Sequence, residues 1–180
     1  SGKLALIYID ADGRVTRTSF DELRDFSCRF ANVLKADGLQ RGDRVGVFLS
    51  QSLELPVAHL AAFRSGLVSV PLSMLFGEDA LEFRLENSGA KAIVTDQAGW
   101  DKLSKIRERL PYLQDIYVIG GETPAGAKSF WQAIETASSD FATVETAAED
   151  PAIIIYTSGT TGNPKGALHA HRVLLGHLPN

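Results

Sequence analysis

Short apolar runs rich in β-branched residues alternate along most of the chain with longer stretches whose apolar residues recur at helical spacing. This alternation is typical of βαβ units around a mostly parallel sheet, because parallel strands are buried on both faces and the connecting helices cover them. The predicted strands are residues 45–49, 67–70, 92–95, 116–119 and 152–156. The predicted helices between them are residues 53–64, 79–86, 100–110 and 130–137. We therefore expect an α/β fold in which helices flank the sheet, with the most continuously hydrophobic run, 152–156, as its central strand.

The N-terminal segment predicts a β-hairpin followed by a helix. Residues 4–10 and 15–18 are short apolar or alternating runs, and the turn between them ends in Gly13, which tolerates a positive φ. Ser19 and Glu22 have the spacing of a capping box, in which each side chain accepts a hydrogen bond from the other residue's backbone N–H. Gly38 stands where a left-handed C-terminal cap is needed, so the helix should end at about Asp37.

Composition narrows the class of protein. With 180 residues, 44% of them hydrophobic and 22% charged, the chain predicts one globular domain. A net charge of −4 gives no broad basic field for nucleic acid or an anionic membrane, so an anionic ligand must be held by local geometry. No apolar run approaches the roughly 20 residues of a membrane span and the start does not resemble a signal peptide, which predicts a cytoplasmic location. The single cysteine, Cys28, is predicted to be a buried, inert thiol.

One loop concentrates polar chemistry directly after the last predicted strand. From Tyr156 to Gly166 the sequence reads Tyr-Thr-Ser-Gly-Thr-Thr-Gly-Asn-Pro-Lys-Gly. Glycines let successive backbone N–H groups turn into one concavity, the hydroxyls add donors, and Lys165 brings a mobile positive charge. This combination suits a polyphosphate. The composition by itself also suits a Ser/Thr/Gly-rich surface turn.

The loop differs from two common nucleotide-binding motifs. It lacks the Gly-Lys-Ser/Thr ending of a Walker A sequence, because Lys165 lies between Pro164 and Gly166, and it does not contain G-x-G-x-x-G. Those motifs place a helix N-terminus against the phosphate, whereas residues 167–169 predict another short strand. An anion held here must therefore rely on backbone N–H groups, hydroxyls and the lysine.

Residues 157–165 resemble, at every position, the signature loop of the adenylate-forming (AMP-binding) superfamily of acyl-CoA synthetases, luciferases and peptide-synthetase adenylation domains. Residues 18–23 and 60–71 are similar to two weaker segments of that family. Because family members are several times longer, the resemblance implies that residues 1–180 are the N-terminal portion of the large AMP-binding domain, without the C-terminal domain and without turnover of its own. A sheet with an uncovered edge and face is also expected to self-associate.

The resemblance implies an acyl-CoA synthetase, an AMP-forming acid–thiol ligase that uses ATP, Mg²⁺ and CoA to activate a small-molecule carboxylic acid, as in fatty acid metabolism. On this basis Lys165 is the catalytic residue, and Thr157 also contacts the magnesium. The residues implied to bind the polyphosphate are Thr157, Ser158, Gly159, Thr160, Thr161, Gly162 and Lys165. Two alternatives remain open: an adenylation domain that activates an amino or aryl acid, and a non-catalytic phosphate-binding or interaction module.

Histidines and aspartates elsewhere in the chain are assigned structural roles. His169 and His171 lie on one side of an extended segment just past the loop, and His59 lies inside a predicted helix, where packing is favoured over catalysis or metal binding. Asp43 and Asp96 flank predicted strands, where a short carboxylate side chain bonds nearby backbone N–H groups. The sequence therefore indicates no carboxylate pair for acid–base chemistry.

Overall fold

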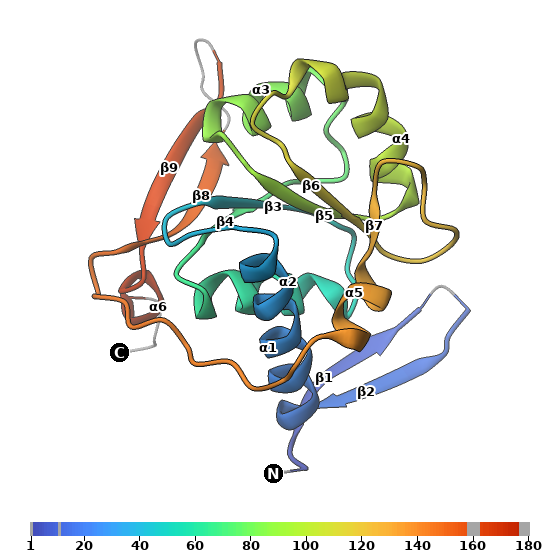
Figure 1. Ribbon diagram of the computed structural model, residues 1–180, viewed down its shortest axis with the longest axis vertical. Helices are drawn as coiled ribbons and strands as arrows, with labels where there is room; N and C mark the ends of the chain where they lie inside the picture. The colour runs from blue at the N-terminus through green and yellow to red at the C-terminus, as the bar shows by residue number, and fades with distance from the viewer. Residues whose placement is uncertain (1, 11, 158–162, 177–180) are drawn as a thin grey trace.

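The computed structural model describes residues 2–10, 12–157 and 163–176, and strands and helices alternate along most of this length (Figure 1). The strands are β1 (Leu4–Ile9), β2 (Val15–Ser19), β3 (Arg44–Phe48), β4 (Val68–Pro71), β5 (Ala92–Thr95), β6 (Asp115–Val118), β7 (Lys128–Ser129), β8 (Pro151–Thr157) and β9 (Lys165–Ala170). The helices are α1 (Phe20–Ala36), α2 (Glu54–Arg64), α3 (Glu78–Ser88), α4 (Gln97–Ile106), the 3₁₀ turn η1 (Arg107–Arg109), α5 (Phe130–Thr136) and α6 (Val173–Gly176).

One large sheet organises these elements. Its seven strands follow the order β7-β6-β5-β3-β4-β8-β9. Neighbours run parallel from β7 to β8, and β9 is antiparallel to β8. β1 and β2 form a separate antiparallel hairpin. The predicted class, a mostly parallel sheet flanked by helices and preceded by an N-terminal hairpin, is therefore confirmed.

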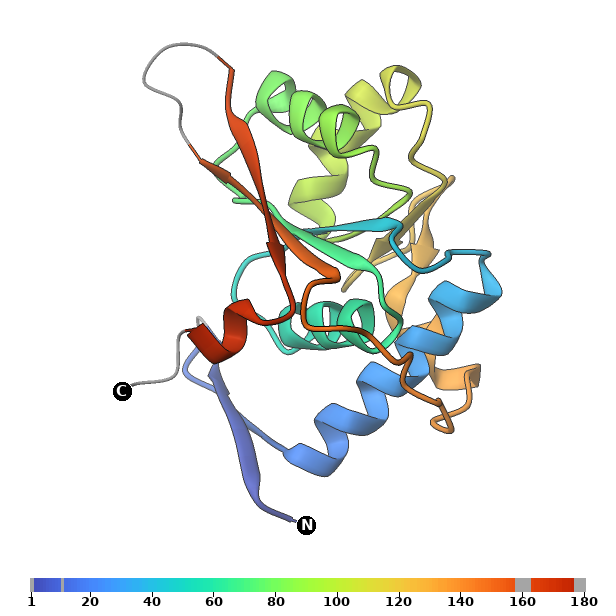
Figure 2. The same ribbon diagram turned by 90° about the vertical axis from the view of Figure 1, so that its left-hand side faces the viewer.

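Helices cover both faces of the large sheet. Figures 1 and 2 show α3 and α4 on one side of it and α1, α2 and α5 on the other. Side chains alternate along a strand, so Val47 of β3 belongs to the core under α1 and α2, whereas Phe48 belongs to the core under α3 and α4. In the first core the ring of Phe30 lies 5.1 Å from that of Tyr117 and 4.7 Å from that of Phe130, between centroids. Two hydrophobic cores thus hold the sheet between helix layers.

Local signals place the ends of α1 where the sequence predicts them. The N–H of Glu22 donates to Ser19 Oγ at 3.2 Å, and the N–H of Ser19 donates to Glu22 Oε2 at 2.7 Å, which completes the capping box. At the other end Asp37 is the C-cap, and Gly38 follows with a φ of 86°. The helix is therefore bounded by residues that act within one turn of its ends.

The predicted helix over residues 100–110 differs from the structure at both ends. The carboxylate of Asp96 accepts a hydrogen bond from the N–H of Gly99 at 2.8 Å, and α4 accordingly begins at Gln97. The α-helix ends at Ile106 and is followed by η1, which stops at Arg109 because Pro111 disfavours helical backbone at Leu110.

The prediction that residues 152–156 form the central strand is wrong. In the described sheet β8 lies second from one edge, between β4 and β9, and β3 is central. β8 is hydrophobic on both faces because Ile154 and Tyr156 pack against the core under α3 and α4, while Ile153 and Ile155 line an apolar cavity on the opposite face. A strand with apolar residues on both faces reads as continuously apolar wherever it stands in the strand order.

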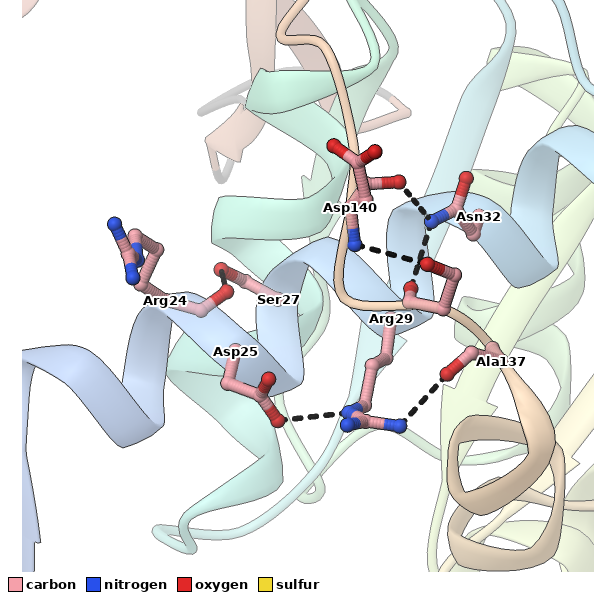
Figure 3. A network of polar contacts seen from close by, with 8 residues as sticks. Arg24, Asp25, Ser27, Arg29, Asn32, Ala137 and Asp140 are labelled. Carbon is pink, nitrogen blue, oxygen red and sulfur yellow. Dashed lines mark hydrogen bonds and ion pairs between the residues drawn. The ribbon is translucent and has the colours of Figure 1, made fainter.

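The segment from α5 to β8 crosses α1 and is held there by polar contacts. Figure 3 shows Arg29 and Asn32 of α1 pointing towards the passing backbone. Arg29 Nη1 donates to the carbonyl of Ala137 at 2.7 Å, and Asn32 Nδ2 donates to the carbonyls of Ser138 and Asp140 at 2.7 and 2.9 Å. Residues 138–150 contain no helix or strand, yet these contacts direct the chain to the start of β8.

The polar segment of residues 120–128 contributes its last residue to β7. Lys128 pairs with Asp37 and Asp115 at 2.6 and 2.8 Å, and these ion pairs tie β7 to the end of α1 and to β6. Cys28 is buried in α1, as predicted. In the part of the chain that the structure describes, no helix has both the length and the apolar character needed to cross a membrane.

Candidate functional site

The predicted phosphate loop joins β8 to β9. β8 ends at Thr157, β9 begins at Lys165, and the two residues are Cα partners in the antiparallel ladder. The predicted site residues that lie outside the described part of the chain are Ser158, Gly159, Thr160, Thr161 and Gly162. The structure therefore brings together the two ends of the predicted site on adjacent strands.

Thr157 and Lys165 project from the same face of the β8–β9 hairpin. Residues that are register partners in an antiparallel ladder share a face, and alternate residues along each strand share it too, so Ile155 and His169 lie on this face as well. Thr157 and Lys165 are both exposed. No hydrogen bond or ion pair joins the Lys165 ammonium to another described residue. A hydroxyl beside an unpaired ammonium is an arrangement that can receive an anion.

This end of the hairpin lies at the carboxyl edge of the parallel sheet. β8 runs parallel to β4, β4 to β3, and β3 to β5, so their last residues meet at the edge where Thr157 lies. Figure 1 shows the end of β8 and the start of β9 near α3, at the top of the view. Ligands of open α/β sheets bind outside the carboxyl ends of the strands. The position of the loop therefore agrees with a binding role.

Sequence reasoning missed the contact that attaches this end of the hairpin to α3. The hydroxyl of Tyr156 lies 2.8 Å from Asn87 Oδ1 and 3.2 Å from the carbonyl oxygen of Arg84. The one signal in the sequence was that Tyr156, an aromatic residue with a hydroxyl, ends the apolar run directly before the loop. Nothing in the local pattern identified a partner 69 residues away.

An apolar cavity of about 260 Å³ opens beside the face that carries Thr157 and Lys165. Its lining residues are Phe63, Ala152, Ile153, Ile155, His169, His171 and Val173. The ring of Phe63 lies between those of His59 and His171, at centroid distances of 6.4 and 6.1 Å. His59 Nδ1 lies 2.7 Å from Ser69 Oγ, and burial lowers the pKa of His59, which keeps its ring neutral. These packed histidines agree with the structural roles that the sequence assigned to them.

The described residues offer little for a metal ion by themselves. They contain no group of three or more His, Cys, Asp and Glu side chains that could hold one. Thr157 presents one exposed hydroxyl at the end of β8. A Mg²⁺ ion bound with a nucleotide needs only about one or two protein oxygens, because phosphates and water supply the other ligands. One hydroxyl fits a magnesium ion whose other ligands are phosphate oxygens and water, and does not fit an ion ligated mainly by protein.

The similarity of this chain to known proteins extends along nearly its whole length. The family described as AMP-binding enzyme matches residues 1–178. Acetyl-coenzyme A synthetase from Bacillus subtilis (strain 168) is 36% identical over 176 residues, which make up 96% of this chain and 30% of that protein. The crystal structure of Brucella canis acyl-CoA synthetase has a TM-score of 0.89 and 33% identity, and the match covers 97% of this chain and 32% of that one.

A nucleotide-bound structure is also similar. The crystal structure of ATP-bound MatB from Rhodopseudomonas palustris has a TM-score of 0.80 and 35% identity, over 97% of this chain and 33% of that one. The chain thus spans about a third of each of these three proteins, 30% in the case of the Bacillus subtilis synthetase. The family predicted from residues 157–165 is confirmed by a match that extends far beyond that loop. This chain belongs to the AMP-binding enzyme family.

Proposed function

We propose that the full-length protein is an AMP-forming acyl-CoA synthetase. In its first step an oxygen of a substrate carboxylate attacks the α-phosphorus of ATP, and the bond to pyrophosphate breaks. In its second step the sulfur of CoA attacks the acyl carbon of the adenylate, AMP leaves, and the thiol proton passes to solvent. A covalent adenylate divides one difficult condensation into two easier displacements.

The loop of residues 157–165 carries this proposal. It agrees with the family signature at every position, and its ends lie at the carboxyl edge of the sheet, where ligands of such sheets bind. Relatives named acetyl-coenzyme A synthetase and acyl-CoA synthetase support the CoA-dependent chemistry over activation of an amino acid. Because the chain spans 30% of the Bacillus subtilis relative, we expect the 180-residue chain alone to show no turnover.

Seven residues of the loop have a role in the proposed first step. Negative charge grows on the departing pyrophosphate, so donors held in place around its oxygens stabilise the transition state. Lys165 supplies the positive charge. The hydroxyls of Thr157, Ser158, Thr160 and Thr161 donate hydrogen bonds, and Gly159 and Gly162 let backbone N–H groups approach the oxygens.

Thr157 is also the proposed protein contact of Mg²⁺. Its hydroxyl is exposed at the end of β8, on the same face as Lys165. When bound, the ion neutralises charge on the phosphates, which is chemistry that a single lysine supplies only in part. Thr157 would hold the ion through its hydroxyl oxygen, on the face of the hairpin that also carries Lys165.

The substrate and setting belong to the same proposal. A carboxylic acid of the kind used in fatty acid metabolism is the proposed acyl donor, and the cytoplasm is the proposed location. Neither nucleic acid nor a membrane is proposed as a partner, since the net charge of −4 provides no general attraction to polyanions.

Carboxylate-dependent exchange of labelled pyrophosphate into ATP tests the first step in the full-length protein. We expect exchange with at least one acid from a panel of acetate, longer fatty acids, aryl acids and amino acids. Thioester formation with free CoA then tests the second step. Exchange without thioester formation would favour an amino- or aryl-acid adenylation domain, and no exchange with any acid would favour a non-catalytic phosphate-binding module.

A further inference from the structure

The β8–β9 hairpin has few attachments to the rest of the sheet. β8 pairs with β4 at a single register position, Ser69 with Ile153, near the start of the strand. Beyond that position the hairpin's backbone pairing, as far as the described residues extend, is between β8 and β9. The end that carries Thr157 and Lys165 therefore needs support from side chains rather than from the ladder of the main sheet.

Tyr156 provides that support on the face opposite to Thr157. Its ring lies close to Gly166: a Cβ atom built on Gly166 would lie 3.2 Å from Cε1 and Cζ of the tyrosine, and 3.0 Å from Cγ2 of Ile154. The same ring meets Phe83 of α3 edge-on, with centroids 6.5 Å apart. The tyrosine thus fills the space between the hairpin and α3, and the absence of a side chain at Gly166 makes that packing possible.

The hydroxyl of Tyr156 adds hydrogen bonding with α3 to this packing. Burial raises the pKa of Tyr156, so the phenol keeps its proton and can donate to Asn87 Oδ1 at 2.8 Å. The carbonyl oxygen of Arg84 lies 3.2 Å from the same hydroxyl. Both partners belong to the last turns of α3, and Arg84 is itself held by a hydrogen bond from Nη1 to the carbonyl of Ala80 at 2.6 Å. The anchor point is therefore part of a rigid element.

We propose that Tyr156 is a positioning residue for the phosphate loop: its hydrogen bond to Asn87 and its packing on Gly166 fix the end of the β8–β9 hairpin that carries the loop against α3. This inference rests on the proposed function. Thr157 follows Tyr156 directly, and Lys165 precedes Gly166, so both ends of the loop adjoin residues of the anchor. A displacement of about 1 Å at a catalytic donor costs up to roughly 100-fold in rate, which makes such an anchor consequential.

The test uses the full-length protein and the variant Tyr156→Phe, which removes the hydroxyl and keeps the ring. We expect kcat for pyrophosphate exchange to fall by roughly 10-fold while KM for ATP changes less, because misplaced donors affect the transition state most. Asn87→Ala should have the same effect, and the double variant should be no slower than either single variant, since both remove one hydrogen bond.

Tyr117→Phe is the matched control. It also removes a tyrosine hydroxyl bond, the one from Tyr117 of β6 to the Asp37 carboxylate at the end of α1, but it lies on a strand separated from β8 by three others in the sheet order. It should lower thermal stability without changing kcat. A Tyr156→Phe protein with wild-type kcat and wild-type KM would overturn the inference.

Amide hydrogen exchange separates a failure of this inference from a failure of the proposed function. Tyr156→Phe should accelerate exchange in residues 165–168 of β9, and Tyr117→Phe should leave those amides unchanged. If the wild-type protein shows no pyrophosphate exchange, the proposed function fails. The amide exchange data then still test whether Tyr156 attaches the hairpin to α3. Unchanged protection of β9 in Tyr156→Phe would overturn the anchor in either case.

Discussion

Thr157 and Lys165 face each other across the β8–β9 ladder as its last described register pair. Directly opposite residues in an antiparallel pair have Cβ atoms about 4.5–5.5 Å apart, so a hydroxyl and an ammonium are held within reach of one anion. Both side chains are exposed. The pair therefore has the features of a binding position and lacks those of a core contact.

Replacing Lys165 with alanine in the full-length protein should lower kcat for adenylation by roughly one to three orders of magnitude, with a smaller change in apparent ATP affinity. The reason is that the ammonium meets more negative charge in the transition state than in bound ATP. Thermal stability should hardly change, because an exposed lysine leaves no cavity behind. Lys35→Ala, at an exposed lysine in the last turn of α1, is the control and should retain full activity. If Lys165→Ala adenylates at the wild-type rate, the phosphate-binding role is wrong and the loop is a structural turn.

Removal of a loop hydroxyl should act in the same way. Thr157→Val keeps the shape of the side chain and deletes its donor, and it should cost about 3 kcal/mol of transition-state stabilisation, the scale of one preorganised donor. Thr157→Ser keeps the hydroxyl and should retain most of the rate. Thr160→Val and Thr161→Val test the other hydroxyls by the same pyrophosphate exchange assay. Equal rates for the valine and serine variants at position 157 would exclude a role for that hydroxyl.

Gly99 is predicted to be the more sensitive of two glycines near the starts of neighbouring helices. A Cβ atom built on Gly99 would lie 1.8 Å from Thr95 Oγ1 and 2.8 Å from a ring carbon of Phe48, whereas one on Gly77 meets nothing within 4 Å. Gly99→Ala should therefore lower the free energy of unfolding by about 1–3 kcal/mol through overpacking. Gly77→Ala should be close to neutral. Chemical denaturation of both variants checks this, and similar midpoints would contradict it.

Stability should fall on mild acidification partly because of His59. Burial lowers the pKa of this residue in the folded protein below its ordinary value of 6.5. As the pH falls below 6.5, the unfolded chain binds a proton that the folded protein does not, so the unfolding free energy decreases until the folded pKa is reached. His59→Gln should weaken this dependence. Urea denaturation between about pH 5 and 8 measures it, and parallel curves for variant and wild type would refute the assignment.

The 180-residue chain is expected to self-associate when it is prepared alone. Ile155, Leu168 and Leu175 are exposed to 41, 58 and 69%, and β9 is an edge strand of the described sheet. Leu168→Lys places a charge on that edge and should reduce association. Light scattering over a range of concentrations, with binding of a hydrophobic dye, measures the effect. A monomer that binds no dye at high concentration would contradict the expectation.

Much of the local structure could be read from the sequence because it depends on neighbours in the chain. The capping box of Ser19 and Glu22 and the left-handed Gly38 after α1 act within one helical turn, and they set helix ends whatever lies elsewhere. The runs of β-branched residues likewise identified the parallel strands β3, β4, β5, β6 and β8, whereas the two-residue strand β7 gave no such signal. The phosphate loop was recognisable for the same reason, since its residues are contiguous and their spacing is itself the signal.

The sequence by itself determined these elements and the loop, whereas their arrangement in space was decided by the tertiary structure. β8 reads as a central strand because it is apolar on both faces, but its place beside β4 and β9 depends on how the chain crosses α1 after α5. The bond from Tyr156 to Asn87 likewise joins residues 69 positions apart. Local patterns report burial and backbone preference, while pairing between distant segments follows from the packing free energy of the whole fold, which no local pattern contains.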